Sequence, residues 1–144
     1  MTIGLDLPIH WGRATLSSVP RGGGYGVGLR AYDHRGHRLL WNPPDEDAPF
    51  YAACDVESRA RDCSFMASCL ATEPESFPYA WVATEVQAKL ADLPVLCWLR
   101  GNGLSRCAGP GEFRLEFPSG LRVRTATLLL ISHGELVLSF GMAR

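Results

Sequence analysis

The residues best suited to acid–base or metal chemistry lie close together in the first third of the chain, at Asp33, His34 and His37. A carboxylate beside an imidazole can exchange protons, but two histidines three positions apart offer two metal ligands at most. The remaining histidines, His10 and His133, occur in unrelated contexts. Because the Asp-His-Arg-Gly-His segment is typical of a turn between strands, we interpret it as a solvated turn and expect no metal site.

Cysteine is the next candidate nucleophile. The chain has five cysteines, Cys54, Cys63, Cys69, Cys97 and Cys107, and no Cys-x-x-Cys pair. These spacings match no disulfide framework, which favours reduced thiols that behave as small buried hydrophobes in a cytoplasm. A catalytic thiol would need a histidine beside it, and either Cys97 or Cys107 could approach His133. The alternative function is therefore a small enzyme or ligand-binding domain with a Cys/His pocket against the sheet.

Glycine is concentrated at residues 22–28, which invites comparison with a phosphate-binding loop. Such a loop needs a lysine followed by serine or threonine, and the chain has no such pair. The loose Gly-x-Gly-x-x-Ala match at 26–31 lies inside a predicted strand instead of opening a helix. We therefore expect no nucleotide and no other cofactor.

Nucleic-acid binding is a third possibility, through five arginines of the last third, Arg100, Arg106, Arg114, Arg122 and Arg124. This function would predict that the affinity for DNA or RNA falls steeply as the salt concentration rises. The formal net charge of −1 argues against a general nucleic-acid binder, and we expect no such partner.

The elements that would position these groups follow from the hydrophobic pattern. Residues 25–32 alternate as in a half-buried strand, and residues 38–41 resume the pattern after the turn, which predicts an N-terminal β-hairpin. A helix-spaced apolar stripe then runs from Val56 to Leu70, with Asp55 placed to cap its start. A second helix is predicted from about residue 76 to 93.

The last third predicts an antiparallel meander. Asn102-Gly103 is a strong hairpin signal, and it would join a strand at 95–99 to a short strand near 105–107. A three-residue loop at 118–120 would place Leu115 opposite Val123 at the start of a long strand, Leu121 to Ile131.

A second turn, at His133-Gly134, would place Ile131 opposite Leu136. The chain is thus expected to be a single α+β domain over residues 1–144. Its predicted parts are an N-terminal β-hairpin, two central helices and a C-terminal antiparallel β-meander packed against the helices.

Charge is distributed unevenly along the 144 residues. Eight acids and two arginines give residues 45–75 a balance of −6, between flanking segments of +3 and +2. Acids at 45–47 precede two aromatic residues, and aromatic anchors beside charge are typical of a protein-docking surface. The predicted partner-binding residues are Asp45, Glu46, Asp47, Phe50, Tyr51, Asp55, Glu57 and Asp62.

These features favour a binding role, since no coherent catalytic constellation is evident. Nearly all basic residues are arginine, as in a GC-rich bacterial genome. We expect an inhibitor or immunity protein that neutralises a toxin or effector, using its acidic surface to attract a basic one. No apolar run approaches the ~18 residues of a membrane span, and no secretory signal is evident, so we expect a cytoplasmic protein without a membrane partner.

Overall fold

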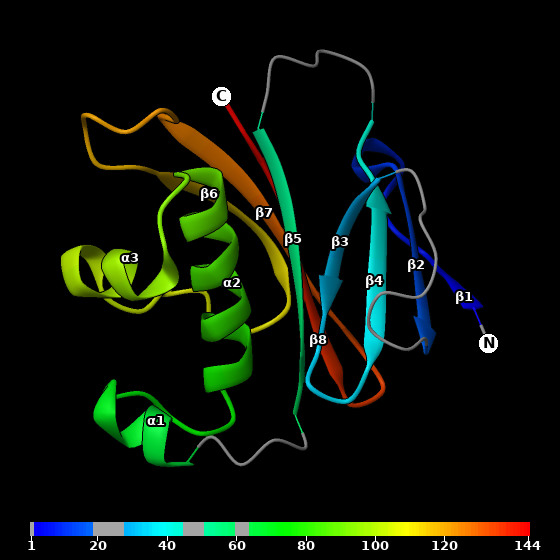
Figure 1. The fold of residues 1–144 in the computed structure, drawn as a ribbon, viewed down its shortest axis with the longest axis horizontal. Coiled ribbons are helices and arrows are strands. Elements are labelled where there is room, and N and C mark those ends of the chain that lie inside the picture. Colours follow the sequence, from blue (N-terminus) through cyan, green and yellow to red (C-terminus); the bar gives the residue numbers. More distant parts are fainter. Residues whose placement is uncertain (1, 19–27, 45–50, 60–63) are drawn as a thin grey trace.

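The computed structural model describes residues 2–18, 28–44, 51–59 and 64–144, and it has the α+β class predicted from the sequence. Figure 1 shows three layers, with helices on one side, a sheet in the centre and a second sheet on the other side. Within the described residues, no helix is long and apolar enough to cross a membrane.

The N-terminal sheet is antiparallel throughout, with the spatial order β1-β2-β4-β3. A 3-10 helix (η1, Ile9–Trp11) precedes its second strand. The predicted hairpin is confirmed as the pair β3–β4 around the turn at 33–37. The four strands are β1 (Thr2–Leu5), β2 (Arg13–Ser18), β3 (Leu29–Tyr32) and β4 (His37–Asn42).

The central sheet is also antiparallel, with the order β5-β8-β7-β6. Its strands are β5 (Tyr51–Ser58), β6 (Gly111–Glu116), β7 (Thr125–His133) and β8 (Leu136–Ala143). The helices are α1 (Ser64–Cys69), α2 (Phe77–Leu90) and α3 (Val95–Asn102). Helix α2 packs on β5 and β8, on the face turned away from the N-terminal sheet.

The central sheet buries apolar side chains on both faces, because neighbouring residues of a strand point to opposite sides. Leu138 and Phe140 pack with Trp11 and Trp41 between the two sheets. Val137, of the opposite parity, packs under the helices. The near-continuous apolar runs of β7 and β8 are therefore those of strands covered on both sides.

The first predicted helix is wrong at its start. Residues 51–58 form β5, and of the described residues only 64–69 of that region are helical. The strand is favoured because Cys54 and Val56 fill the space between the sheets while Ala53 packs on the helical side. An alternating burial requirement has overridden the helix-spaced stripe. The second predicted helix is confirmed as α2.

The predicted strand at 95–99 is also wrong, because this segment is α3. Asn102-Gly103 ends that helix instead of closing a hairpin. Gly103 has φ +74°, and its N–H donates to the Leu99 carbonyl oxygen at 2.9 Å. A glycine of positive φ serves a helix end as well as a hairpin turn, so the dipeptide alone does not separate the two.

Both predicted meander registers are wrong, although the meander β6–β7–β8 itself is present. Leu115 lies opposite Ala126 instead of Val123, because residues 117–124 form a longer connection in which Phe117 and Val123 turn into the core. Ile131 lies opposite Leu138 instead of Leu136, because the turn is Gly134-Glu135.

Candidate functional site

A pocket of about 340 Å³ lies at one end of the space between the two sheets. On each of four strands, a polar residue that lines this pocket lies two positions from an apolar residue packed between the sheets. Residues two apart share a face, so the four polar side chains converge. The pairs are Leu16 and Ser18 on β2, Leu39 and His37 on β4, Val56 and Ser58 on β5, and Ile131 and His133 on β7.

The pocket combines an apolar wall with a charged mouth. Ile3, Leu16 and Leu136 line it from three strands, and Arg35 and Glu135 line it from the β3–β4 and β7–β8 turns. These turns lie side by side at the lower edge of Figure 1, and Arg35 Nη1 lies 3.6 Å from a Glu135 carboxylate oxygen. The volume is at the lower end of the range for small-molecule sites, about 300–1,000 Å³.

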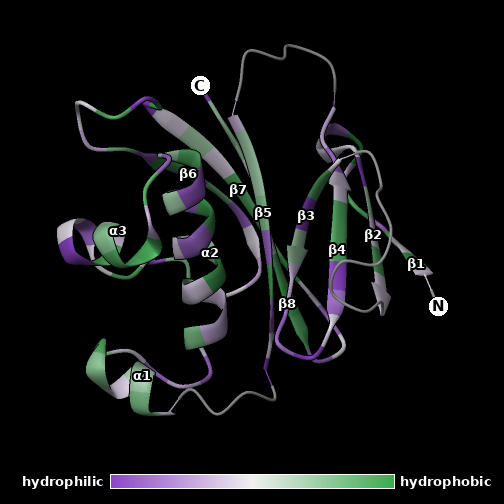
Figure 2. Ribbon diagram, in the orientation of Figure 1, coloured by the Kyte–Doolittle hydropathy of each residue, from purple (hydrophilic) through white to green (hydrophobic). Residues whose placement is uncertain are grey.

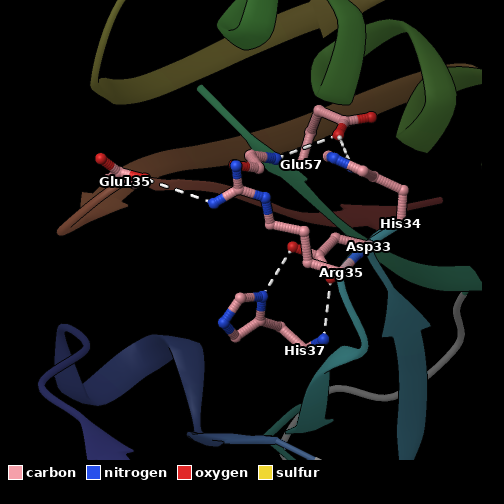
Figure 3. Close-up of polar contacts among 7 residues, drawn as sticks. Asp33, His34, Arg35, His37, Glu57 and Glu135 are labelled. Atoms are coloured by element: carbon pink, nitrogen blue, oxygen red, sulfur yellow. Dashed lines mark hydrogen bonds and ion pairs between the residues drawn. The ribbon is translucent and has the colours of Figure 1, made fainter. Parts of the chain in front are cut away.

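A short polar contact beside the pocket joins Asp33 to His37 (Figure 3). The Asp33 side chain is fully buried, and its Oδ2 lies 2.7 Å from His37 Nδ1. Its other oxygen, Oδ1, accepts the backbone N–H groups of Arg35 at 3.0 Å and His37 at 2.8 Å. The two carboxylate oxygens thus have separate tasks, one closing the turn and one orienting the imidazole.

This arrangement fixes which nitrogen of His37 is available. In the neutral ring, Nδ1 carries the hydrogen and donates it to Asp33, so Nε2 keeps its lone pair for another partner. Figure 2 shows β4 hydrophilic where it begins and hydrophobic beyond. The interpretation of residues 33–37 as a solvated turn is wrong for Asp33, whose carboxylate is shielded from water.

A second carboxylate–histidine contact lies next to the first. Glu57 Oε1 accepts the Ser58 backbone N–H at 3.0 Å and lies 3.3 Å from His34 Nδ1, which links the turn to β5. His34 does not line the pocket. Among the described residues, no group of three or more His, Cys, Asp or Glu side chains is arranged to hold a metal ion.

The predicted partner-binding residues divide into two groups. Asp45, Glu46, Asp47, Phe50 and Asp62 lie outside the described residues. Of the remaining three, only Tyr51 is exposed, with the Arg122 guanidinium carbon 4.0 Å from its ring centre.

Asp55 and Glu57 were expected on an exposed helical face, and this is a correction: both are buried on β5. Lys89 of α2 donates to Asp55 Oδ1 at 3.1 Å and to the Cys54 carbonyl oxygen at 2.8 Å. Burial nevertheless raises the Asp55 pKa to about 7, because the loss of hydration outweighs the attraction of Lys89.

The predicted approach of a cysteine to His133 is not observed. Cys107 is buried in the cluster under the helices, Cys97 is exposed on α3, and neither lines the pocket that contains His133. Burial raises the pKa of the Cys54 thiol to about 12 and also raises that of Cys107. The four described cysteines are free thiols, and Cys63 lies outside the described residues.

Sequence reasoning singled out Asp33 and His37, which it interpreted as part of a turn, and named His133 for a pocket, but it missed Ser18, Ser58, Arg35 and Glu135 as pocket residues. The missed signal is a polar residue that ends an alternating apolar series, as Ser18 does after Leu16. It becomes informative only when the strands are known to pair. Comparisons with protein-family models, curated protein sequences and solved structures found no match for this chain.

Proposed function

We propose that the protein is a small ligand-binding domain whose pocket between the sheets holds a small polar molecule next to His37. The supporting observation is the convergence of polar side chains from β2, β4, β5 and β7 on a cavity where the half-buried His37 contacts the buried Asp33 carboxylate. Buried, oriented polar groups in a concave site are typical of ligand recognition. This is the alternative function suggested by the sequence, with serines in the place of the cysteines.

The lining indicates what kind of molecule fits. Arg35 and His133 supply hydrogen-bond donors at the mouth, and His37 Nε2 supplies an acceptor. Ile3 and Leu136 offer apolar contact on the wall. The ligand is therefore a small molecule with a carbonyl or carboxylate group and a short apolar part.

NMR spectroscopy tests this proposal with a defined panel of probes: acetate, butyrate, lactate and the methyl esters of these acids. We expect saturable shifts confined to residues that line the pocket, with dissociation constants in the millimolar range or tighter, about −4 kcal/mol or more favourable. His37→Gln should weaken binding about tenfold by removing the hydrogen-bond partner that the imidazole offers in the pocket.

His10→Gln is the matched control, because His10 also contacts a carboxylate, that of Glu112 at 3.2 Å, but does not line the pocket. This variant should bind as the parent protein does. Shifts that never saturate, or that lie outside the pocket, would overturn the proposal.

Protein binding is a second candidate, favoured by Tyr51. In the sequence, Tyr51 comes four positions after Asp47, the last of the acidic residues 45–47, and Arg122 lies over its exposed ring, so charge and aromatic surface are adjacent at Tyr51. In this proposal the chain is a bacterial cytoplasmic inhibitor or immunity protein that neutralises a toxin or effector. Asp45, Glu46 and Asp47 would speed association with a basic partner.

Affinity capture from a bacterial lysate, followed by association kinetics with the captured protein, tests the second candidate. Asp45→Lys/Glu46→Lys/Asp47→Lys should slow association and leave thermal stability nearly unchanged. The control, Asp6→Lys/Glu112→Lys/Glu116→Lys, adds the same charge at exposed positions outside the acidic segment 45–75. Equal association rates for the two variants would exclude the acidic segment as a docking surface.

A further inference from the structure

Ser18 lies directly opposite His37 at the rim of the pocket. The two residues are register partners in the β2–β4 pair, and both line the pocket. Opposed residues of an antiparallel pair point to the same face, with Cβ atoms about 4.5–5.5 Å apart. Three groups are therefore neighbours in space: the Ser18 hydroxyl lies opposite the His37 imidazole, which in turn contacts the buried Asp33 carboxylate.

We propose that Ser18 is a nucleophile and His37 its general base, with Asp33 as the positioning residue, in the hydrolysis of a small carboxylic ester. This inference rests on the proposed function of the same pocket as a small-molecule site. Such a site is recognised by the geometry and roles of its groups rather than by their order in the chain.

Two other serines line the pocket and fit this role less well. Ser17 is buried and lies opposite Arg38, so its side chain belongs to the other face of β2. Ser58 is 1% exposed. Ser18 is exposed at the end of its strand, where a substrate carbonyl has access to it.

The reaction balances with water as the co-reactant. His37 Nε2 takes the proton from Ser18 Oγ as Oγ bonds to the carbonyl carbon, and the carbonyl electron pair moves to oxygen. When this intermediate collapses, the ester C–O bond breaks and His37 gives the proton to the departing alkoxide. Water then cleaves the acyl-serine by the same transfers, which releases the carboxylic acid and restores Ser18.

Two features of the pocket support these steps. Arg35 and His133 line the same cavity and provide donors for the negative oxygen that develops on the carbonyl. Asp33 holds the His37 tautomer that leaves Nε2 free to accept a proton. In this structure Ser18 and His37 form no hydrogen bond with each other; catalytic hydrogen bonds of this kind often tighten only when substrate is bound.

Asp33→Asn separates the catalytic role from a purely structural one. The asparagine keeps an oxygen for the backbone N–H groups of Arg35 and His37, so the turn remains closed. It places an NH₂ group opposite His37 Nδ1, which favours the tautomer with hydrogen on Nε2 and removes the base. Nitrogen-15 shifts of the His37 ring should report this change of tautomer, which a role in closing the turn would not produce.

The decisive experiment combines p-nitrophenyl acetate turnover with labelling by a fluorophosphonate, which reacts with activated serines. We expect one phosphonyl adduct, mapped to Ser18 by mass spectrometry and absent from Ser18→Ala. His37→Gln and Asp33→Asn should lower both rates by about 100-fold or more. Ser68→Ala and His10→Gln, which change exposed residues that do not line the pocket, should leave both rates unchanged.

An adduct on another residue would overturn the inference, as would unchanged rates in folded His37→Gln and Asp33→Asn. If the NMR probes bind in the pocket but no ester is cleaved and no serine is labelled, the binding function stands and the catalytic inference fails. If no probe binds in the pocket, both fail.

Discussion

At the scale of single residues, burial decides what each ionisable group can do. Asp33 and Asp55 are both shielded carboxylates, yet their partners differ. Asp33 is surrounded by donors, two backbone N–H groups and the His37 ring. Asp55 has one cationic neighbour, Lys89, and two acidic ones, Glu57 and Glu85, which disfavour its charged form.

Asp55→Asn tests that balance. The Asp55 pKa is raised from 3.8 to about 7, so between these pH values the folded state holds a proton that the unfolded state has lost. The stability contributed by Asp55 is therefore fully present below about pH 4 and is lost as pH rises through 7. Asparagine does not titrate, so the unfolding free energy of the parent protein minus that of the variant should fall across this window.

Urea denaturation at a series of pH values measures this difference. The parent and Asp55→Asn share every other titrating group, so most other pH effects cancel. A difference that rises with pH would mean that the contact with Lys89, at 3.1 Å, outweighs burial.

The cysteines give a second prediction at this scale. Cys69 and Cys97 are exposed, whereas Cys54 and Cys107 are buried with raised pKa values. Because the thiolate is the reactive form, iodoacetamide at neutral pH should modify Cys69 and Cys97 in the folded protein. Mass spectrometry should find Cys54 and Cys107 modified only after denaturation, and their rapid alkylation without denaturant would contradict the burial described.

At the scale of elements, the contact of α2 with the central sheet depends on Gly141 of β8. A Cβ at this position would lie 2.5 Å from Val86 Cγ1 and 3.0 Å from Leu90 Cδ1. Gly141→Ala should therefore destabilise the protein by about 1–3 kcal/mol through overpacking, measured by urea denaturation. Val86→Ala in the same chain should recover part of that loss by removing the clash.

Gly4→Ala is the matched control, since Gly4 is also in a strand but has nothing within 4 Å of the added Cβ. This substitution should change the unfolding free energy by no more than about 0.5 kcal/mol. If the two alanine variants have equal stability, the close approach of α2 to β8 is not a constraint.

Elements were predictable where one local signal dominated. The turn at 33–37 and helix α2 have uninterrupted patterns with clear ends, and both are present. The segment 95–102 carries signals that fit a strand as well as a helix, and it forms α3, with Trp98 buried in the core on the helical side of the central sheet. Registers failed because the number of residues in a connection depends on whether Phe117 and Val123 are in the loop or in the core.

At the scale of the whole molecule, the sequence predicted a C-terminal meander packed against the helices. In the structure the helices cover one face of the central sheet, and the N-terminal sheet covers the other. The candidate pocket was not predictable, because it requires the ends of β2, β4, β5 and β7 to meet in space. Asp33 and His37 were visible in the sequence, but the burial of Asp33 follows only from the pairing of strands.

The shared central sheet predicts that both cores unfold together, as expected for a single domain. Trp41 is fully buried between the sheets, and its ring centre lies 5.2 Å from that of Phe140. The Trp41 Nε1 donates to the Trp11 carbonyl oxygen at 2.7 Å. Trp41→Ala should cost about 3–5 kcal/mol, a large share of the roughly 5–15 kcal/mol of a typical domain.

Hydrogen exchange monitored by NMR distinguishes shared from separate unfolding. If the layers are one cooperative unit, amides of α2 should lose as much protection in Trp41→Ala as amides of β2 and β4, although α2 does not touch the substituted residue. Phe65→Ala serves as the control, because Phe65 is an exposed aromatic residue of α1, outside α2 and both sheets. Wild-type protection of α2 combined with lost protection of β2 would mean that the N-terminal sheet folds independently. The pocket would then lie between two separable units, and ligand binding would have to couple their stabilities.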